Sequence, residues 1–172
     1  MNKSLQNIFE DVGKVSLFTM RFFREVFSTS FEMKAFLLQC YTIGVKSLPL
    51  VSITGLIMGL VLTIQSRPTL IQFGAESWLP GMVGLSLVRE IAPVITALIC
   101  AGKIGSGIGA ELGAMKVTEQ IDAMEVSAIN PFKYLVVTRI MATTLMIPLL
   151  VIYADFIGVF GGFIGYNIHE KI

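Results

Sequence analysis

The stretch GKIGSGIGAELGAMKVTEQIDAMEVSAIN, residues 102–130, decides how this chain is organised, because it separates two long apolar segments. Its first part is rich in glycine. In its second part, apolar side chains recur along one helical stripe, at Val117, Ile121, Met124 and Ala128. Acidic side chains follow on the other side, at Glu119, Asp122 and Glu125. We therefore expect an amphipathic helix over 115–128, whose acidic face either meets a partner or is solvated as part of a cytoplasmic loop.

The composition of the chain indicates an integral membrane protein. Hydrophobic residues make up 54% of the sequence, charged residues only 15%, and the mean hydropathy is +0.77. The net charge of +1 does not provide the cluster of basic residues that nucleic-acid binding requires. Cys40 and Cys100 lie in apolar surroundings without metal-ligand or CxxC spacing, so no redox or metal role is predicted.

Three apolar segments are long enough to cross a bilayer, and they cover residues 47–66, 82–108 and 134–168. The first contains no charged residue. The third is longer than one untilted crossing needs and contains Pro148 and Asp155, so we expect a bent helix or a helix followed by a loop.

Residues 5–27 have a different pattern, with polar and charged positions beside a single apolar stripe formed by Leu5, Ile8, Phe9, Val12, Val15, Phe22, Phe23 and Val26. This pattern predicts a helix that lies on the membrane surface. Lysine and arginine are frequent before the first span and around the acidic helix, whereas the loop after the first span contains only Arg67. The positive-inside bias therefore places the N-terminal region and the acidic helix in the cytoplasm.

Glycines with small-xxx-small spacing predict close helix packing, at Gly55/Gly59, Gly105/Gly109, Gly109/Gly113, Gly158/Gly162 and Gly161/Gly165. Arg89 and Glu90 are ionisable groups within the second span, where charge is costly. They either line a polar transport cavity or form a structural ion pair between helices, and the same alternatives apply to Asp155. No serine, cysteine or histidine has the spacing of a hydrolase motif, so no catalytic residue is predicted.

Two runs of the sequence closely resemble the MlaE-type (YrbE-type) permeases of ABC transporters, which move phospholipids and other lipids across the bacterial envelope. These runs are GLIMGLVLTIQ, residues 55–65, and SLVREIAPVITALICAGKIGSGIGAELGAMKVTEQIDAMEVSAINPFKYLV, residues 86–136. The resemblance covers essentially the whole chain. It implies one all-α permease domain over 1–172 in the bacterial inner membrane, with segment 5–27 as an interfacial elbow helix and segment 115–128 as a cytoplasmic coupling helix.

The resemblance also implies partners and site residues. In such transporters two permeases form a dimer, a separate cytoplasmic ATPase hydrolyses ATP, and periplasmic MCE-domain proteins lie above. The permease itself needs no cofactor. Lipid contacts carry over to Leu62, Thr69, Leu70, Phe73, Arg89 and Glu90. Contacts with the ATPase carry over to Glu111, Lys116, Glu119, Gln120, Asp122 and Glu125.

The chain departs from the family in length, because members usually continue for two more spans, so it looks like a truncated or fragmentary permease. Two other functions are compatible with the residues. One is a membrane scaffold that recruits a cytoplasmic protein through the acidic helix without transporting anything. The other is an ion- or proton-coupled carrier that uses Arg89, Glu90 and Asp155. A copurifying ATPase and bound lipid would separate a lipid permease from both.

Overall fold

The computed structural model describes residues 3–27 and 32–170, and the side chains of residues 9–27 and 32–168. Within these residues every regular element is a helix, which confirms the predicted all-α class. The elements are α1 (Lys3–Val26), α2 (Met33–Ile43), η1 (Val45–Ser47), α3 (Leu48–Gln72), η2 (Glu76–Trp78), α4 (Leu79–Ser86), η3 (Leu87–Ile91), α5 (Ala92–Val117), α6 (Gln120–Val126), η4 (Phe132–Val137) and α7 (Thr138–Glu170).

Three helical stretches of the described chain are long and apolar enough to cross a membrane, and they cover Met33–Gln72, Glu76–Val117 and Phe132–Ile168. The protein is therefore a multi-pass membrane protein. Each expected span lies inside one of these stretches. The third stretch continues as α7 through Pro148 without a loop. A loop within lipid would leave backbone hydrogen-bonding groups unsatisfied, which explains why the helix continues.

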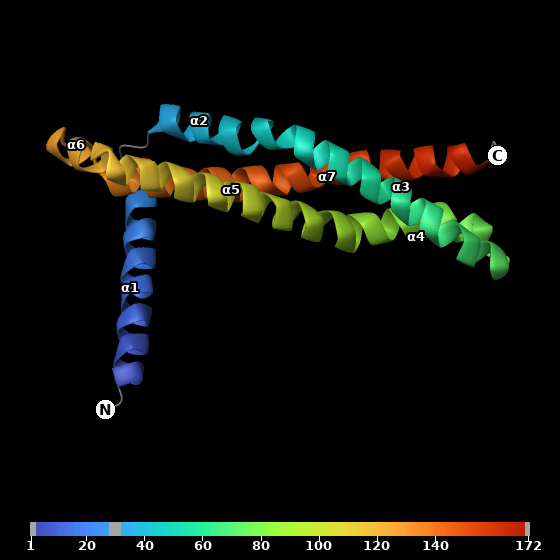
Figure 1. The fold of residues 1–172 in the computed structure, drawn as a ribbon, viewed down its shortest axis with the longest axis horizontal. Coiled ribbons are helices and arrows are strands. Elements are labelled where there is room, and N and C mark those ends of the chain that lie inside the picture. Colours follow the sequence, from blue (N-terminus) through green and yellow to red (C-terminus); the bar gives the residue numbers. More distant parts are fainter. Residues whose placement is uncertain (1–2, 28–31, 171–172) are drawn as a thin grey trace.

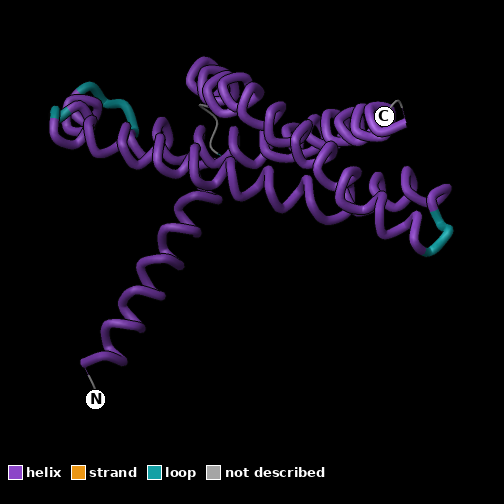
Figure 2. The backbone as a smooth tube through the Cα atoms, turned by 45° about the vertical axis from the view of Figure 1, so that its right-hand side comes forward, coloured by secondary structure: helices purple, strands orange, loops and turns teal. Residues whose placement is uncertain are grey.

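The three stretches lie side by side in an elongated bundle (Figure 1). The short helix α6 lies at one end, together with the beginning of α2. The turn between α3 and α4 lies at the opposite end, near the end of α7, and Figure 2 shows the same arrangement from a second direction. We call these the α6 end and the α4 end of the bundle.

Helices α3 and α7 form the closest helix pair, and glycines allow this close approach. A β-carbon added to Gly59 would overlap the carbonyl oxygen of Gly158, and one added to Gly161 would overlap the carbonyl oxygen of Leu56. The predicted packing role is thus confirmed for the glycine pairs of α3 and α7. The glycines of α5 differ, because added β-carbons at Gly105 or Gly109 would have no neighbour within 4 Å. In the described chain, the predicted packing on the α5 pairs is therefore not found.

Helix α1 leaves the side of the bundle and runs transverse to its long axis (Figure 1). The ring of Phe18 meets that of Phe132 edge to face at 5.1 Å between centroids, and Arg21 lies over the same ring at 4.4 Å. Phe9 and Val15 of the expected apolar stripe are exposed, whereas the side chains of Leu5 and Ile8 lie outside the described residues. A transverse helix with an uncovered apolar stripe has the form of an interfacial helix.

Candidate functional site

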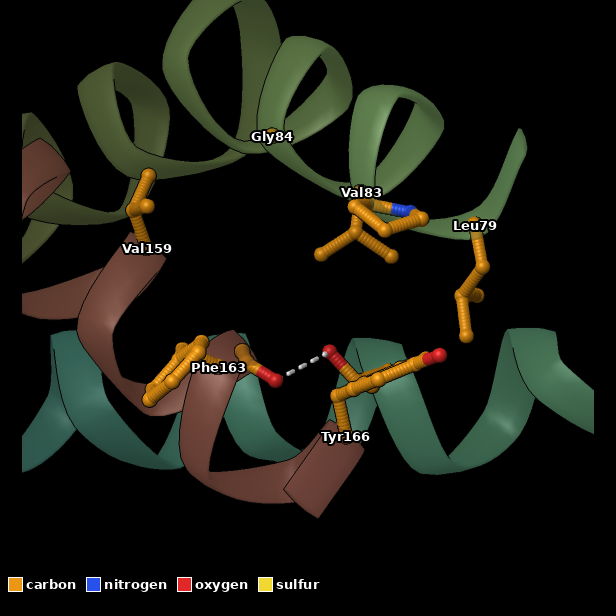
Figure 3. A pocket seen from close by; sticks show the side chains of 9 residues that line it. Leu79, Val83, Gly84, Val159, Phe163 and Tyr166 are labelled. Atoms are coloured by element: carbon orange, nitrogen blue, oxygen red, sulfur yellow. Dashed lines mark hydrogen bonds between the residues drawn. The ribbon is translucent and has the colours of Figure 1, made fainter. Parts of the chain in front are cut away.

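An apolar groove opens between α4 and α7 near the α4 end, with α3 as its floor. Its volume is about 350 Å³. The lining residues come from all three helices and are Thr63, Leu79, Pro80, Val83, Gly84, Val159, Gly162, Phe163 and Tyr166. In Figure 3, Val83 on α4 faces Phe163 and Tyr166 on α7 across the opening. Leu79 and Val83 also belong to the main core cluster, so one wall of the groove is held rigidly.

The few polar atoms of the groove are placed by hydrogen bonds. The Thr63 hydroxyl donates to the carbonyl oxygen of Gly59 at 2.9 Å and lies 3.3 Å from that of Gly162, so it is satisfied within the bundle. Next to the groove, the guanidinium carbon of Arg67 lies 5.7 Å from the centroid of the Tyr166 ring. The groove is thus almost entirely apolar, with an aromatic ring and a cation at one margin.

Arg67 is held by one carboxylate and keeps one donor group unused. Its Nε and Nη2 atoms donate to the Oε1 atom of Glu76 at 3.1 and 2.8 Å. The Arg67 side chain is 14% exposed, and its buried Nη1 has no hydrogen-bond partner among the described residues. Because buried polar groups are normally satisfied, Nη1 is an unusual unsatisfied donor at the margin of the groove.

The six residues predicted to contact lipid fall into three environments, and Arg89 and Glu90 share one of them, the π-helical turn η3. Leu62 and Leu70 are partly buried against the main core cluster. Thr69 and Phe73 are exposed near the turn that follows α3, and Phe73 is 79% exposed. None of the six lines the groove itself. Their role in lipid binding stays a prediction.

Arg89 and Glu90 lie in η3, a π-helical turn between α4 and α5. Pro93 follows within α5 and lacks an N–H group, so the regular hydrogen bond to the carbonyl oxygen of residue 89 cannot form. Both side chains are exposed, and among the described residues neither makes an ion pair. The structural ion-pair alternative is thus not found in the described chain. Single π-helical turns are frequent at functional sites.

The acidic segment is divided into two helices, in contrast to the single helix expected over 115–128. Helix α5 ends at Val117 and α6 begins at Gln120, because Glu119 adopts a left-handed conformation with a φ of 56°. Val117 is consequently 85% exposed and does not share a packed stripe with Ile121 and Met124, which are half-buried. Ala128, with a φ of 59°, lies beyond the end of α6.

Some of the residues predicted to contact an ATPase form ion pairs within the chain, and others are exposed without one among the described residues. Glu111 pairs with Arg139, with 2.8 Å between Oε2 and Nη2, and this arginine side chain is only 4% exposed. Lys116 and Asp122 form an exposed ion pair at 3.2 Å. Glu119, Gln120 and Glu125 are exposed. The acidic surface at the α6 end is therefore formed mainly by Glu119, Asp122 and Glu125.

The groove was not predicted from the sequence, where only a weak local signal could have indicated it. Gly84 and Gly162 are small residues surrounded by large apolar ones, and both line the groove. The same spacing occurs at glycines that pack against a neighbouring helix, so spacing alone does not distinguish a groove from a contact. The groove forms where α4 crosses α7, so it depends on the tertiary structure.

These features define a multi-pass α-helical membrane protein with an apolar groove at one end and an exposed acidic helix at the other. A comparison with protein families matches residues 36–172 to the family described as Permease MlaE. The chain belongs to this permease family.

The relatives of the chain are longer permeases. It is 39% identical over 155 residues to a probable ABC transporter permease protein of Rickettsia felis, covering 90% of this chain and 60% of the relative. It is 42% identical over 124 residues to the intermembrane phospholipid transport system permease protein MlaE of Haemophilus influenzae, covering 72% of this chain and 48% of the relative. The chain thus spans 60% of the Rickettsia relative's length and 48% of the Haemophilus one's.

Proposed function

We propose that this chain acts as the permease subunit of an ABC transporter that moves phospholipid or a related lipid between the bacterial inner membrane and periplasmic MCE-domain partners. The match of residues 36–172 to the permease family carries this proposal. A relative with 42% identity is named as a phospholipid transport permease, which favours lipid as the substrate class.

The groove between α4 and α7 suits an acyl chain. Its lining consists of aliphatic and aromatic side chains, and its volume of about 350 Å³ lies within the range of small-molecule sites. In the proposed orientation the α4 end is periplasmic, because the loop there contains few basic residues. The groove would therefore receive the tails of a lipid on the side where periplasmic partners act.

Polar contacts with a lipid head group are proposed at two places. Arg67 offers its unpartnered Nη1 beside the groove. Arg89 offers an exposed guanidinium on the π-helical turn, and Glu90 lies next to it. Leu62, Thr69, Leu70 and Phe73 complete the proposed lipid-binding set. A guanidinium matches the geometry of a phosphate well, since it presents several donors in one plane.

Energy for transport would come from a separate ATPase subunit. The exposed acidic surface at the α6 end is a suitable contact for a basic groove on such a partner. A rigid-body shift of α6 would pass through α5, which continues directly into η3 and α4 beside the lipid groove. A second permease copy is proposed as a further partner.

The lipid assignment is tested by filling the groove. Gly84→Leu places a side chain in the groove without a backbone clash, because an added β-carbon at Gly84 has no neighbour within 4 Å. We expect this variant to retain several-fold less phospholipid per protein after purification, measured by mass spectrometry, and to transport correspondingly less lipid in proteoliposomes.

Gly81→Leu is the matched control, because Gly81 also lies in α4 with open space around it but does not line the groove. It should retain wild-type lipid. If Gly84→Leu retains as much lipid and transports as well as Gly81→Leu, the groove is not the lipid site. An absence of lipid transport by the wild-type complex, with a cytoplasmic protein still bound to α6, would favour the scaffold function instead.

A further inference from the structure

A second pocket lies between α2 and α5 in the half of the bundle nearer the α6 end, away from the groove between α4 and α7. Its volume is about 190 Å³. Two lysines, one glutamate and several hydroxyl or amide groups line it, and the full set is Gln39, Thr42, Ile43, Lys46, Ser47, Lys103, Ile104, Gly107, Ile108 and Glu111. This lining is much more polar than that of the groove.

Hydrogen bonds fix the ammonium group of Lys103 at this pocket. Its Nζ atom donates to the backbone carbonyl oxygen of Lys46 and to the hydroxyl oxygen of Ser47, the second at 3.2 Å. Ser47 is 1% exposed, so this anchor is rigid. A lysine ammonium has three N–H donors, and two of them are used here. The third is available to a ligand that occupies the pocket.

The charge of the pocket is positive, although Glu111 is part of its wall. The Glu111 carboxylate is neutralised by Arg139 at 2.8 Å, and this arginine does not line the pocket. Lys46 and Lys103 have no acidic partner among the described residues. Two positive charges therefore face the same cavity without compensation, which favours an anion.

The position of the pocket along the bundle identifies the kind of anion. The uncharged apolar segment begins at Ser47, directly after Lys46, so the pocket lies where the hydrocarbon layer meets the head groups. The α6 end is the cytoplasmic one in the orientation proposed above. Basic pockets between membrane helices on this side bind anionic lipid head groups. We propose that the pocket binds the phosphate group of an anionic phospholipid from the cytoplasmic leaflet.

This site is distinct from the transport groove and does not depend on transport. Its test uses the protein in nanodiscs of phosphatidylcholine that contain a small fraction of photoactivatable phosphatidylglycerol. Crosslinks are mapped by mass spectrometry to peptides of α2 and α5. We expect Lys46→Gln and Lys103→Gln each to lower the crosslink yield about fivefold, as expected for one basic residue near an anionic lipid surface.

Gly107→Leu tests the cavity separately from its charge. An added β-carbon at Gly107 meets no atom within 4 Å, so the leucine enters the pocket while both lysines remain. We expect it to abolish the specific crosslink. The matched controls are Lys34→Gln, which removes one positive charge from α2 outside the pocket, and Gly105→Leu, which adds the same side chain to α5 outside the pocket.

The results that would overturn the proposal are specific. Yields for Lys46→Gln and Gly107→Leu that equal those of the two controls would show that the pocket holds no lipid phosphate. Competition identifies the source of the phosphate: excess unlabelled phosphatidylglycerol should displace the probe, and inorganic phosphate should not. Displacement by inorganic phosphate alone would assign the pocket to a soluble anion and refute the lipid assignment.

Discussion

Gly59 of α3 and Gly158 of α7 lie in direct backbone contact, so that a β-carbon at Gly59 would overlap the carbonyl oxygen of Gly158. No side chain can be added at this point without separating the helices. Because lipid provides little hydrophobic drive for helix association, close packing of this kind is a main source of stability in membrane bundles.

We therefore expect Gly59→Ala to destabilise the protein by about 1–3 kcal/mol, the usual cost of overpacking. Thermal unfolding in detergent or nanodiscs measures this change. Gly102→Ala is the control, because its β-carbon would have no neighbour within 4 Å. Equal unfolding temperatures for the two variants would show that α3 and α7 do not pack as described.

A second prediction concerns the contribution of the ion pair between Glu111 and Arg139 to stability. Glu111→Gln leaves the guanidinium of Arg139 buried without a countercharge, and we expect a loss of about 1–3 kcal/mol. The double variant Glu111→Gln/Arg139→Met should recover most of this loss, because no buried charge remains. A double variant less stable than Glu111→Gln alone would contradict this reasoning.

The orientation of the bundle can be tested with single cysteines in a background in which Cys40 and Cys100 are replaced. Glu76 lies at the α4 end and Glu119 at the α6 end. A membrane-impermeant thiol reagent applied from the periplasmic side should label a cysteine at position 76 and not one at position 119. Labelling of both positions from that side would refute the proposed topology.

The proposed contact between an ATPase and the acidic surface at the α6 end is tested by reversing the charge at Glu119 and Asp122. Replacing both by lysine should cost several kcal/mol at a contact with a basic partner, so ATPase copurification should fall at least about tenfold. Membrane insertion should be unchanged. Glu10→Lys/Asp11→Lys makes the same charge change on exposed positions of α1 and should retain the ATPase. Undiminished ATPase binding by the Glu119/Asp122 variant would show that α6 is only a solvated loop helix.

The predicted lipid contacts outside the groove are best tested at Phe73. Because Phe73 is 79% exposed, Phe73→Asp should lower copurifying phospholipid without unfolding the protein, whereas Leu70→Asp also disturbs the core. Trp78→Asp, at a residue that is 75% exposed in the same turn, is the control. Arg89→Ala should lower transport more than assembly. If it dissociates the complex instead, Arg89 is a structural residue.

The helices could be predicted from sequence because lipid leaves the backbone few alternatives. A long uncharged run such as 47–66 must satisfy its backbone hydrogen bonds internally, and only a helix does so within one segment. The glycine pairs of α3 and α7 likewise indicated close packing. Which helices meet could not be predicted, since the same spacing in α5 faces open space.

The features that the sequence did not predict depend on tertiary contacts or unusual backbone. The break at Glu119 occurs at a residue type that rarely has positive φ, with no glycine or proline next to it. The burial of Lys133 and Arg139, which are 6% and 3% exposed, could not be predicted from their charge. The apolar groove between α4 and α7 and the pocket between α2 and α5 each require helices that are distant in sequence.

The pairing of α3 with α7 also constrains how the protein is made. Helix α3 leaves the ribosome before α4, α5 and α6, and its glycine face has no partner until α7 has been synthesised. Helix α1 likewise has no packing partner in the described chain until Phe132, at the beginning of the third stretch, has been synthesised, because Phe18 and Arg21 pack on the ring of Phe132. The first half of the chain must therefore remain in the bilayer unassembled, in contact with lipid or with the insertion machinery, until translation has passed the third span.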